Sequence, residues 1–202
     1  YALSLSVLAY IYNNLELVAE AEVQYLESLQ ILERIAKDNT QSYATVLNGL
    51  AHLYLKLGRL SEAESVYQHS LRITIKCLGE NTLDYATGLH GLANAYLRQG
   101  RLNEAEIAYK QCLEIDGRLD GRETLSCASQ LHGLASVYYD LGRLSEAENA
   151  YLRSLEIKKK ITGEEALDYA IGLNCLANVY NILGRYGEAE TAYLRALEIE
   201  KK

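Results

Sequence analysis

Four residues with hydrogen-bonding side chains recur at a spacing of 42 positions: Asn48, His90, His132 and Asn174. Amide and imidazole groups can each donate and accept a hydrogen bond. A row of them can therefore bind the N–H and C=O groups of an extended peptide. Asparagine is also a poor helix former. Its presence at positions where Glu or Lys would favour the helix more therefore indicates a functional role. The pattern predicts a binding surface.

Further polar residues fall on the same helical stripes and complete the predicted site. Two of them, Lys56 and Arg98, are cations in a chain whose net charge is −7, and they favour an acidic ligand. The alternative is structural, with these side chains forming hydrogen bonds between neighbouring helices, and the two roles are compatible. The candidate peptide-binding residues are Asn48, His52, Lys56, His90, Asn94, Arg98, His132, Tyr139, Asn174, Asn178 and Asn181.

The sequence lacks the residue patterns of catalysis, metal binding, nucleic-acid binding and membrane insertion. No nucleophile–base pair stands outside the repeat and no glycine-rich phosphate loop is present, so we expect no enzyme, no catalytic residue and no cofactor. Neighbouring helices lie about 10 Å apart, too far for His90 and His132 to share a zinc ion, and no metal site is expected. The acidic charge without a basic stripe argues against nucleic acid. No apolar run approaches the roughly 20 residues of a membrane span.

The elements that must position these side chains come from one unit of 42 residues that occurs five times. A fixed period of this size indicates a solenoid, in which stacked helical units bury faces that none buries alone. We therefore expect one array over 1–202, with repeats at 1–42, 43–84, 85–126, 127–168 and 169–202.

The second repeat illustrates the expected helical hairpin. Its first half places Leu47, Leu50, Ala51 and Tyr54 on one helical face. Gly58 suits the left-handed position that ends a helix. The same order of apolar positions and helix-ending residues in every repeat predicts ten antiparallel helices and no strand, which is an all-α fold.

The helix ends carry their own signals. Ser61 with Glu64 predicts a capping box for the second helix, and Gly79 ends that helix. Asp84 is placed to cap the first helix of the next repeat. Repeat one carries Glu16 where the others have glycine, which predicts either a looser turn or a role of this repeat as an N-terminal end cap.

Further sets of equivalent positions in the repeats, here called columns, are predicted to serve packing. Arg59 and its equivalents are each followed by a glutamate three residues later, which predicts an ion-pair ladder between repeats. Gly91 and Gly133 lie beside core leucines, where a side chain would block a neighbouring helix. Cys112 and Cys175 stand where other repeats have Ser, Ala or Gly. They indicate small buried or half-buried thiols in a reducing compartment, and we expect a cytoplasmic protein.

Six columns carry a resemblance to a known family, and in the second repeat they are Leu47, Leu50, Ala51, Tyr54, Ala63 and Tyr67. The pattern recurs in all five repeats and resembles the tetratricopeptide repeat. The 42-residue period and the Leu-Gly-Arg turn are similar to those of kinesin light chains. The resemblance implies a right-handed superhelix whose first helices line a concave groove that holds an extended peptide.

The expected function is a protein–protein interaction scaffold that binds an extended, acidic or polar peptide, or a partner helix, in this groove. Two alternatives stay open. One is self-association into a homo-oligomer through uncapped repeat ends, because solenoids need polar terminal caps for solubility. The other is a sensor or regulatory segment of a larger signalling protein. Neither nucleic acid nor a membrane is an expected partner.

Overall fold

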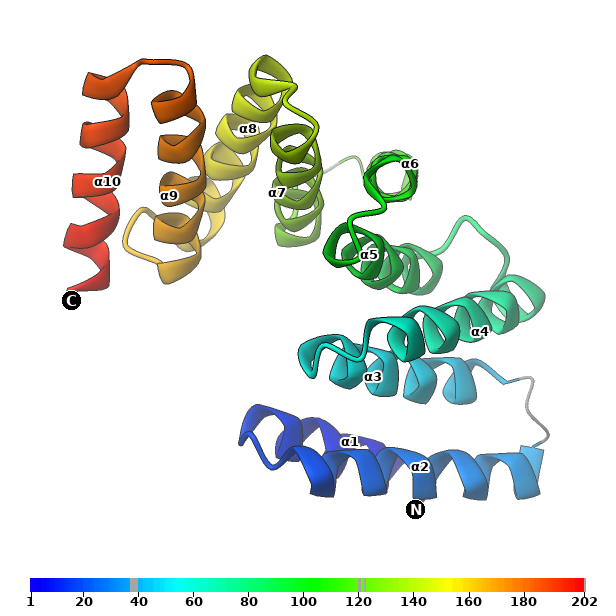
Figure 1. Cartoon of the computed structure of the whole chain (residues 1–202). Coiled ribbons are helices and arrows are strands. Elements are labelled where there is room, and N and C mark those ends of the chain that lie inside the picture. Colours follow the sequence, from blue (N-terminus) through cyan, green and yellow to red (C-terminus); the bar gives the residue numbers. More distant parts are fainter. Residues whose placement is uncertain (37–39, 120, 122, 202) are drawn as a thin grey trace. The chain divides into compact units, whose positions relative to one another are not determined.

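The computed structural model describes residues 1–36, 40–119, 121 and 123–201, and over these it contains ten α-helices and no strand (Figure 1). The chain divides into two compact units, Tyr1–Arg101 and Leu102–Lys202. The first unit contains α1 (Ala2–Asn14), α2 (Val18–Ala36), α3 (Gln41–Lys56), α4 (Leu60–Leu78) and α5 (Leu83–Arg98). The second contains α6 (Leu102–Leu119), α7 (Leu125–Asp140), α8 (Leu144–Thr162), α9 (Leu167–Ile182) and α10 (Tyr186–Glu200). The predicted all-α solenoid is confirmed.

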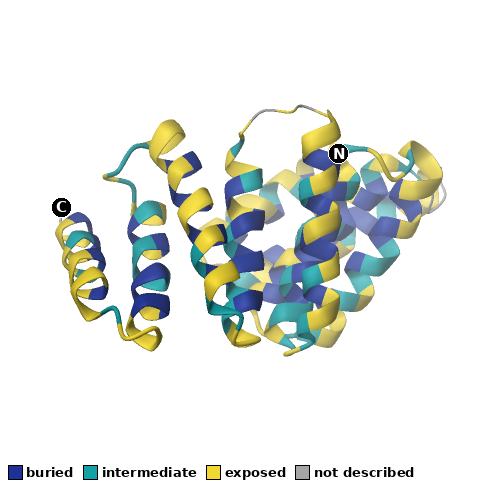
Figure 2. Cartoon of the chain, turned by 90° about the horizontal axis from the view of Figure 1, so that it is seen from above, coloured by how far each residue is buried: buried dark blue, intermediate teal, exposed yellow. Residues whose placement is uncertain are grey.

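Helical hairpins stack in sequence order within each unit. In the first unit α1 packs on α2 and α3 on α4, and α2 and α4 also contact the next first helix. In the second unit α7 packs on α8 and α9 on α10, with α6 against α7 and α8 against α9. The contacts α1–α3, α3–α5 and α7–α9 place the first helices of successive repeats side by side, here called the first-helix layer. Figure 2 shows buried residues on one side of most helices and exposed residues on the other.

Glycines allow the second helix of one repeat to approach the first helix of the next. A Cβ atom on Gly91 would lie 2.3 Å from the ring of Tyr67, and one on Gly133 would lie 2.4 Å from Tyr109. Both tyrosines are buried. The predicted packing role of Gly91 and Gly133 is therefore confirmed, and the tyrosine ring is the group that a side chain would displace.

Repeat five has a cysteine in this glycine column. Cys175 is half-buried and Cys112 is buried, as predicted. Tyr151, the tyrosine of the preceding second helix, lies beside Cys175. Its hydroxyl shares a hydrogen bond of 2.9 Å with Ser136.

The turn inside the hairpin has one geometry throughout. Its glycine adopts φ values of 73° to 75°, in the left-handed region, at Gly58, Gly100, Gly142 and Gly184. Glu16 adopts φ 61°. The amide of Leu17 donates to the carbonyl of Tyr12 at 2.9 Å, the same distance as in the equivalent bond of repeat two. The prediction of a looser turn is therefore wrong, because repeat one keeps the turn with a residue whose Cβ disfavours it.

The second helix begins earlier than the capping pattern predicts. The α4 helix starts at Leu60, with Arg59 at the N-cap and no side-chain hydrogen bond there. The amide of Leu60 bonds to the carbonyl of Gly58 at 2.9 Å, so the preceding turn leads directly into the helix. Ser61 is consequently inside the first turn, and the predicted capping box of Ser61 with Glu64 is wrong.

Three of the five first helices, α3, α5 and α7, are capped by threonine. The Oγ1 atom of Thr82 accepts a hydrogen bond of 3.2 Å from the amide of Tyr85. Thr40 and Thr124 cap α3 and α7 in the same way. Asp84 lies within the first turn of α5, so its prediction as the cap is wrong. Its carboxylate instead accepts a hydrogen bond of 2.9 Å from Gln41.

Glu64 binds the next repeat instead of capping its own helix. Arg101 donates to its carboxylate at 2.7 Å. Equivalent pairs join Arg59 to Glu22, Arg143 to Glu106 and Arg185 to Glu148, each at 2.8 Å. The predicted ladder between repeats thus exists, but its carboxylates belong to the preceding second helix.

Each of these arginines also binds within its own repeat. Arg59 pairs with Glu62 three residues later, and its guanidinium carbon lies 4.1 Å from the ring centroid of Tyr54. Cation–π contacts of 4.3 to 4.4 Å recur at Arg101, Arg143 and Arg185. One guanidinium therefore connects both helices of its hairpin to the preceding repeat.

Candidate functional site

The predicted residues of the first unit lie on α3 and α5, which contact each other in the first-helix layer. The side chains of His52, Lys56 and Arg98 are exposed, and those of Asn48, His90 and Asn94 are half-buried. Although His52 is exposed, partial desolvation of its ring lowers its pKa, with a smaller effect from the charge of Lys56. The imidazole is therefore neutral near pH 7 and can both donate and accept.

Lys56 and Arg98 share a column and a structural role. The Lys56 ammonium donates a hydrogen bond of 3.0 Å to the carbonyl of Asn13, and the Arg98 guanidinium donates to the carbonyl of Leu55. Both carbonyls belong to the last turn of the preceding first helix, where a cation interacts favourably with the helix dipole. Sequence reasoning missed this role, although the recurrence of a cation in one column is a signal for it.

Asn48 is half-buried where α3 meets α5. Its Oδ1 atom lies 3.3 Å from the position that a Cβ on Gly88 would take, so this glycine leaves room for the amide. Oδ1 is buried and accepts no hydrogen bond from any residue that the structure describes. A buried acceptor without a donor costs about 1–3 kcal/mol. A peptide N–H or a water molecule would remove this cost.

His132 on α7 is a half-buried candidate residue of the second unit. Its ring packs edge-on against Tyr151, with centroids 5.2 Å apart, and its Nε2 lies 3.9 Å from the Cys175 sulfur. Burial, reinforced by the charge of Lys158, lowers the pKa of His132 to about 4. The imidazole is neutral near pH 7, and its buried Nδ1 has no hydrogen-bond partner among the described residues.

Two asparagines of α9 bond to the second helix of their own repeat. Asn174 donates to Glu200 at 3.1 Å, and Asn178 accepts from the Tyr193 hydroxyl at 2.5 Å. These contacts match the structural alternative, in which the polar column joins neighbouring helices. Asn178 and Asn181 are nevertheless exposed, whereas Tyr139 on α7 is half-buried.

Over the described ranges the chain has neither a metal-binding cluster nor a helix that could span a membrane. No group of three His, Cys, Asp or Glu side chains there is arranged to hold a metal ion. Within the same ranges, no helix has the length and apolar character needed to cross a bilayer.

The repeat architecture and its recurring contacts agree with the match to a known family. The family model of the tetratricopeptide repeat matches residues 1–76, 42–118 and 120–202. The chain therefore belongs to the tetratricopeptide repeat family. This fold is typically a non-enzymatic scaffold for protein–protein interaction, and the repeats indicate that this chain is a protein–protein interaction scaffold.

Solved structures refine this placement. BtubC (BKLC) from P. vanneervenii has a TM-score of 0.83 at 27% sequence identity, over 98% of this chain and 78% of that one. A putative kinesin light chain from Podosopora anserina, with nearly identical TPR-like repeats, has a TM-score of 0.78 at 24% identity, over 98% and 93% of the two chains. The predicted similarity to kinesin-light-chain repeats is confirmed.

A third structure shares the fold at lower identity. It is a Rap protein complexed with Competence and Sporulation Factor, with a TM-score of 0.82 and 16% identity, over 96% of this chain and 52% of that one. No curated protein matches the sequence significantly.

Proposed function

We propose that this chain is a scaffold that binds an extended, acidic or polar peptide, or a partner helix, in a concave groove lined by the first-helix layer. The observation that carries the proposal is the exposure of His52, Lys56 and Arg98 on α3 and α5. They supply two positive charges and a neutral donor–acceptor group on adjacent helices of an acidic protein. Electrostatic complementarity then favours a ligand that bears carboxylates.

The structural bonds of these cations leave capacity for a ligand. A lysine ammonium has three donors and an arginine guanidinium has five, so one bond to a helix carbonyl leaves others available. In the second unit, Asn178 and Asn181 are also exposed and can donate and accept hydrogen bonds. A pre-formed surface of this kind has a small ordering cost on binding.

A ligand-bound relative of this fold supports the proposal. The Rap protein was solved in complex with Competence and Sporulation Factor, so a protein that contains this fold can bind such a ligand. The same surface serves the alternative in which the chain is a sensor or regulatory segment of a larger signalling protein. The two readings share one binding site and differ in what the bound ligand controls.

The test is binding of an array of short acidic peptides to the full chain, with Arg98→Ala and Arg72→Ala as a matched pair. Each variant removes one exposed positive charge from the first unit, but Arg72 lies on α4, outside the first-helix layer. We expect Arg98→Ala to weaken binding about 5- to 10-fold, the effect of one charge-assisted hydrogen bond. Arg72→Ala should leave the affinity unchanged. Circular dichroism checks the folding of both variants.

Salt provides the second arm of this test. Exposed charges are screened as ionic strength rises, so affinity for an acidic peptide should fall between low and high salt. Salt-independent binding, or equal losses in Arg98→Ala and Arg72→Ala, would contradict the electrostatic part of the proposal.

Self-association is a second candidate, and one observation favours a particular form of it. Residues 1–15 contain no Asp, Glu, Lys or Arg, and α1 exposes Leu3, Val7, Tyr10 and Ile11 by 45–59%. A charge-free apolar face has no like-charge repulsion across a two-fold axis. We therefore propose that two copies pair through α1.

Head-to-tail stacking fits less well than two-fold pairing. Val7 stands in the glycine column, where an added Cβ in repeats two to four would lie 2.3 to 2.6 Å from a tyrosine ring. Leu17 replaces the arginine that binds the preceding glutamate in later repeats. The molecular mass from light scattering distinguishes these possibilities. We expect a dimer that dissociates in Val7→Lys. Val23→Lys, which changes an exposed residue of α2, is the control and should leave the dimer intact. A monomeric wild type rules this candidate out.

A further inference from the structure

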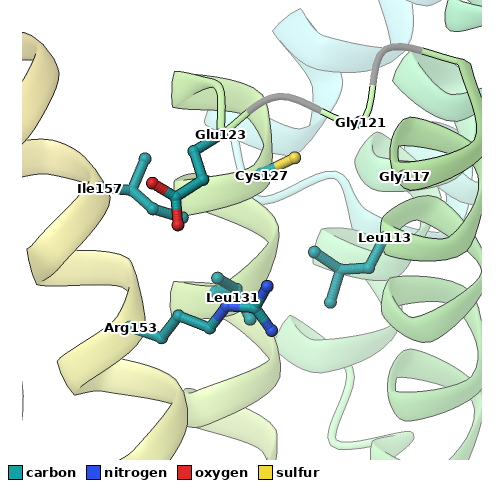
Figure 3. A pocket seen from close by; sticks show the side chains of 8 residues that line it. All are labelled: Leu113, Gly117, Gly121, Glu123, Cys127, Leu131, Arg153 and Ile157. Carbon is teal, nitrogen blue, oxygen red and sulfur yellow. The ribbon is translucent and has the colours of Figure 1, made fainter.

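A cavity of about 190 Å³ lies in the second unit, between the end of α6, the start of α7 and the middle of α8 (Figure 3). Three of its walls are apolar: Leu113, Leu131 and Ile157. Leu131 and Ile157 belong to one buried cluster, and Leu113 and Cys127 pack against it. The other lining residues are Gly117, Gly121, Glu123, Cys127 and Arg153, so one carboxylate and one guanidinium border the apolar walls. The cavity lies apart from the residues assigned to peptide binding.

The origin of this cavity is seen by comparison with repeat two. The positions equivalent to Gly117, Cys127 and Arg153, which lie 84 residues earlier, hold Glu33, Tyr43 and His69. Tyr43 is buried, and its hydroxyl donates a hydrogen bond of 2.7 Å to Glu33. Its ring packs edge-on against His69, with centroids 6.0 Å apart. Repeat two therefore fills this position with a phenol ring and its carboxylate acceptor.

In repeat four both groups are absent. Cys127 replaces the tyrosine that stands in this column in the other four repeats, and Gly117 removes the facing carboxylate. A Cβ at Gly117 would meet no atom within 4 Å, so the space in front of this residue is open. The cavity thus takes the place of a tyrosine side chain that this repeat lacks.

Arg153 adds a recognition group to the apolar walls. Its guanidinium makes no ion pair with any residue that the structure describes, and Figure 3 shows the side chain extending along the cavity past Leu131. Cations are attracted to aromatic faces. This protein already uses that contact at four other arginines, which lie 4.1 to 4.4 Å from tyrosine rings.

We propose that this cavity is a binding site for a phenol-sized aromatic ring, held between the three apolar side chains and Arg153. An apolar cavity of about 150 Å³ is large enough to bind benzene, so 190 Å³ accommodates a para-substituted phenol. The ring comes either from a free small phenol or from a tyrosine side chain of a partner. Both sources share the same chemistry.

The test uses p-cresol, which is the tyrosine side chain cut at Cβ, and the full chain. Backbone amide shifts in two-dimensional NMR should change saturably at Gly117, Cys127 and Ile157. We expect a dissociation constant of about 1 mM, the order typical of a ligand with so few non-hydrogen atoms. Cyclohexanol, which has no aromatic face, serves as the ligand control and should bind at least about 5-fold more weakly, because it loses the cation–π contact.

Two variants fill the cavity from opposite sides. Cys127→Tyr restores the column residue, and Gly117→Ile introduces the residue of the equivalent position, Ile75. Each should abolish p-cresol binding, and the second keeps the test decisive if the first does not fold. Absence of saturable binding to the wild type, or unchanged binding to a folded filled variant, overturns the proposal.

A reciprocal variant tests the origin of the site. The triple change Glu33→Gly, Tyr43→Cys and His69→Arg recreates the same constellation in repeat two and should raise the stoichiometry from one p-cresol to two. An unchanged stoichiometry in the folded variant contradicts the assignment to a missing ring. Competition by N-acetyltyrosinamide separates the two sources: displacement of p-cresol supports a peptide tyrosine, and binding of p-cresol alone supports a free phenol.

Discussion

Lys56 donates a hydrogen bond of 3.0 Å from its ammonium to the main-chain oxygen of Asn13, in the last turn of the preceding first helix. Arg98 makes the equivalent bond to Leu55 one repeat later. The two exposed cations therefore hold adjacent repeats together while still facing solvent. Variants at these positions that test the proposed ligand binding therefore also change contacts between repeats and need controls for stability.

Lys56→Ala should lower the free energy of unfolding by about 0.5–1 kcal/mol, because the end of α1 loses a cation that complements its dipole. Urea denaturation of the full chain measures this change. His52→Ala on the same helix is the control, since its exposed side chain makes no such bond. A loss of equal size in both variants would show that the bond to Asn13 contributes nothing specific.

Glu16→Gly should stabilise the chain by about 0.5–1 kcal/mol. The left-handed conformation costs a residue with a Cβ about 1–2 kcal/mol, and the added flexibility of glycine in the unfolded chain offsets part of the gain. Gly58→Ala, at the equivalent position with φ 75°, should destabilise by about 1 kcal/mol. Thermal or urea unfolding tests both, and two changes of the same sign would refute this account of the turn.

The stability contributed by His132 should depend on pH. Its pKa is about 4 in the folded chain and about 6.5 when unfolded, so the unfolded state binds the proton more tightly. The contribution is fully present above pH 6.5 and is lost as pH falls from 6.5 towards 4. Between pH 7.5 and 5.5 we expect a loss of about 1 kcal/mol, measured from urea midpoints.

His132→Asn is the matched variant for this measurement, because Asn174 and Asn48 occupy the same column. It should flatten the pH dependence in this window relative to the wild type. If the two proteins lose the same stability on acidification, His132 does not carry the effect.

The arginine ladder should show a measurable but modest coupling. In the pair of Arg143 with Glu106, the two side chains are 36% and 14% exposed, so a double-mutant cycle with alanine should give about 0.5–1 kcal/mol. Salt should reduce this coupling. Arg143→Lys keeps the positive charge but loses the bidentate geometry of the guanidinium and its stacking on Tyr138. It should recover less than half of the stability that is lost in Arg143→Ala. Full recovery by lysine would indicate that charge alone matters.

Much of the candidate site follows from helical periodicity. Periodicity alone predicts that His52 and Lys56 share a helix face, because residues three and four apart do so, and that Arg98 occupies the equivalent position of the next repeat. Periodicity does not specify how far one helix slides along its neighbour. The bonds of Lys56 to Asn13 and of Asn174 to Glu200 depend on that offset, so their structural roles emerged only from the structure.

The sequence by itself determined the 42-residue period, the all-α hairpins and the glycines that end the helices. These features are local, because a helix face and a left-handed turn are properties of consecutive residues. The tertiary structure decided that Glu64 binds Arg101 instead of capping α4, and that the change from tyrosine to Cys127 leaves a cavity. Both results depend on which side chains two stacked helices bring together, and a single repeat contains only half of each such contact.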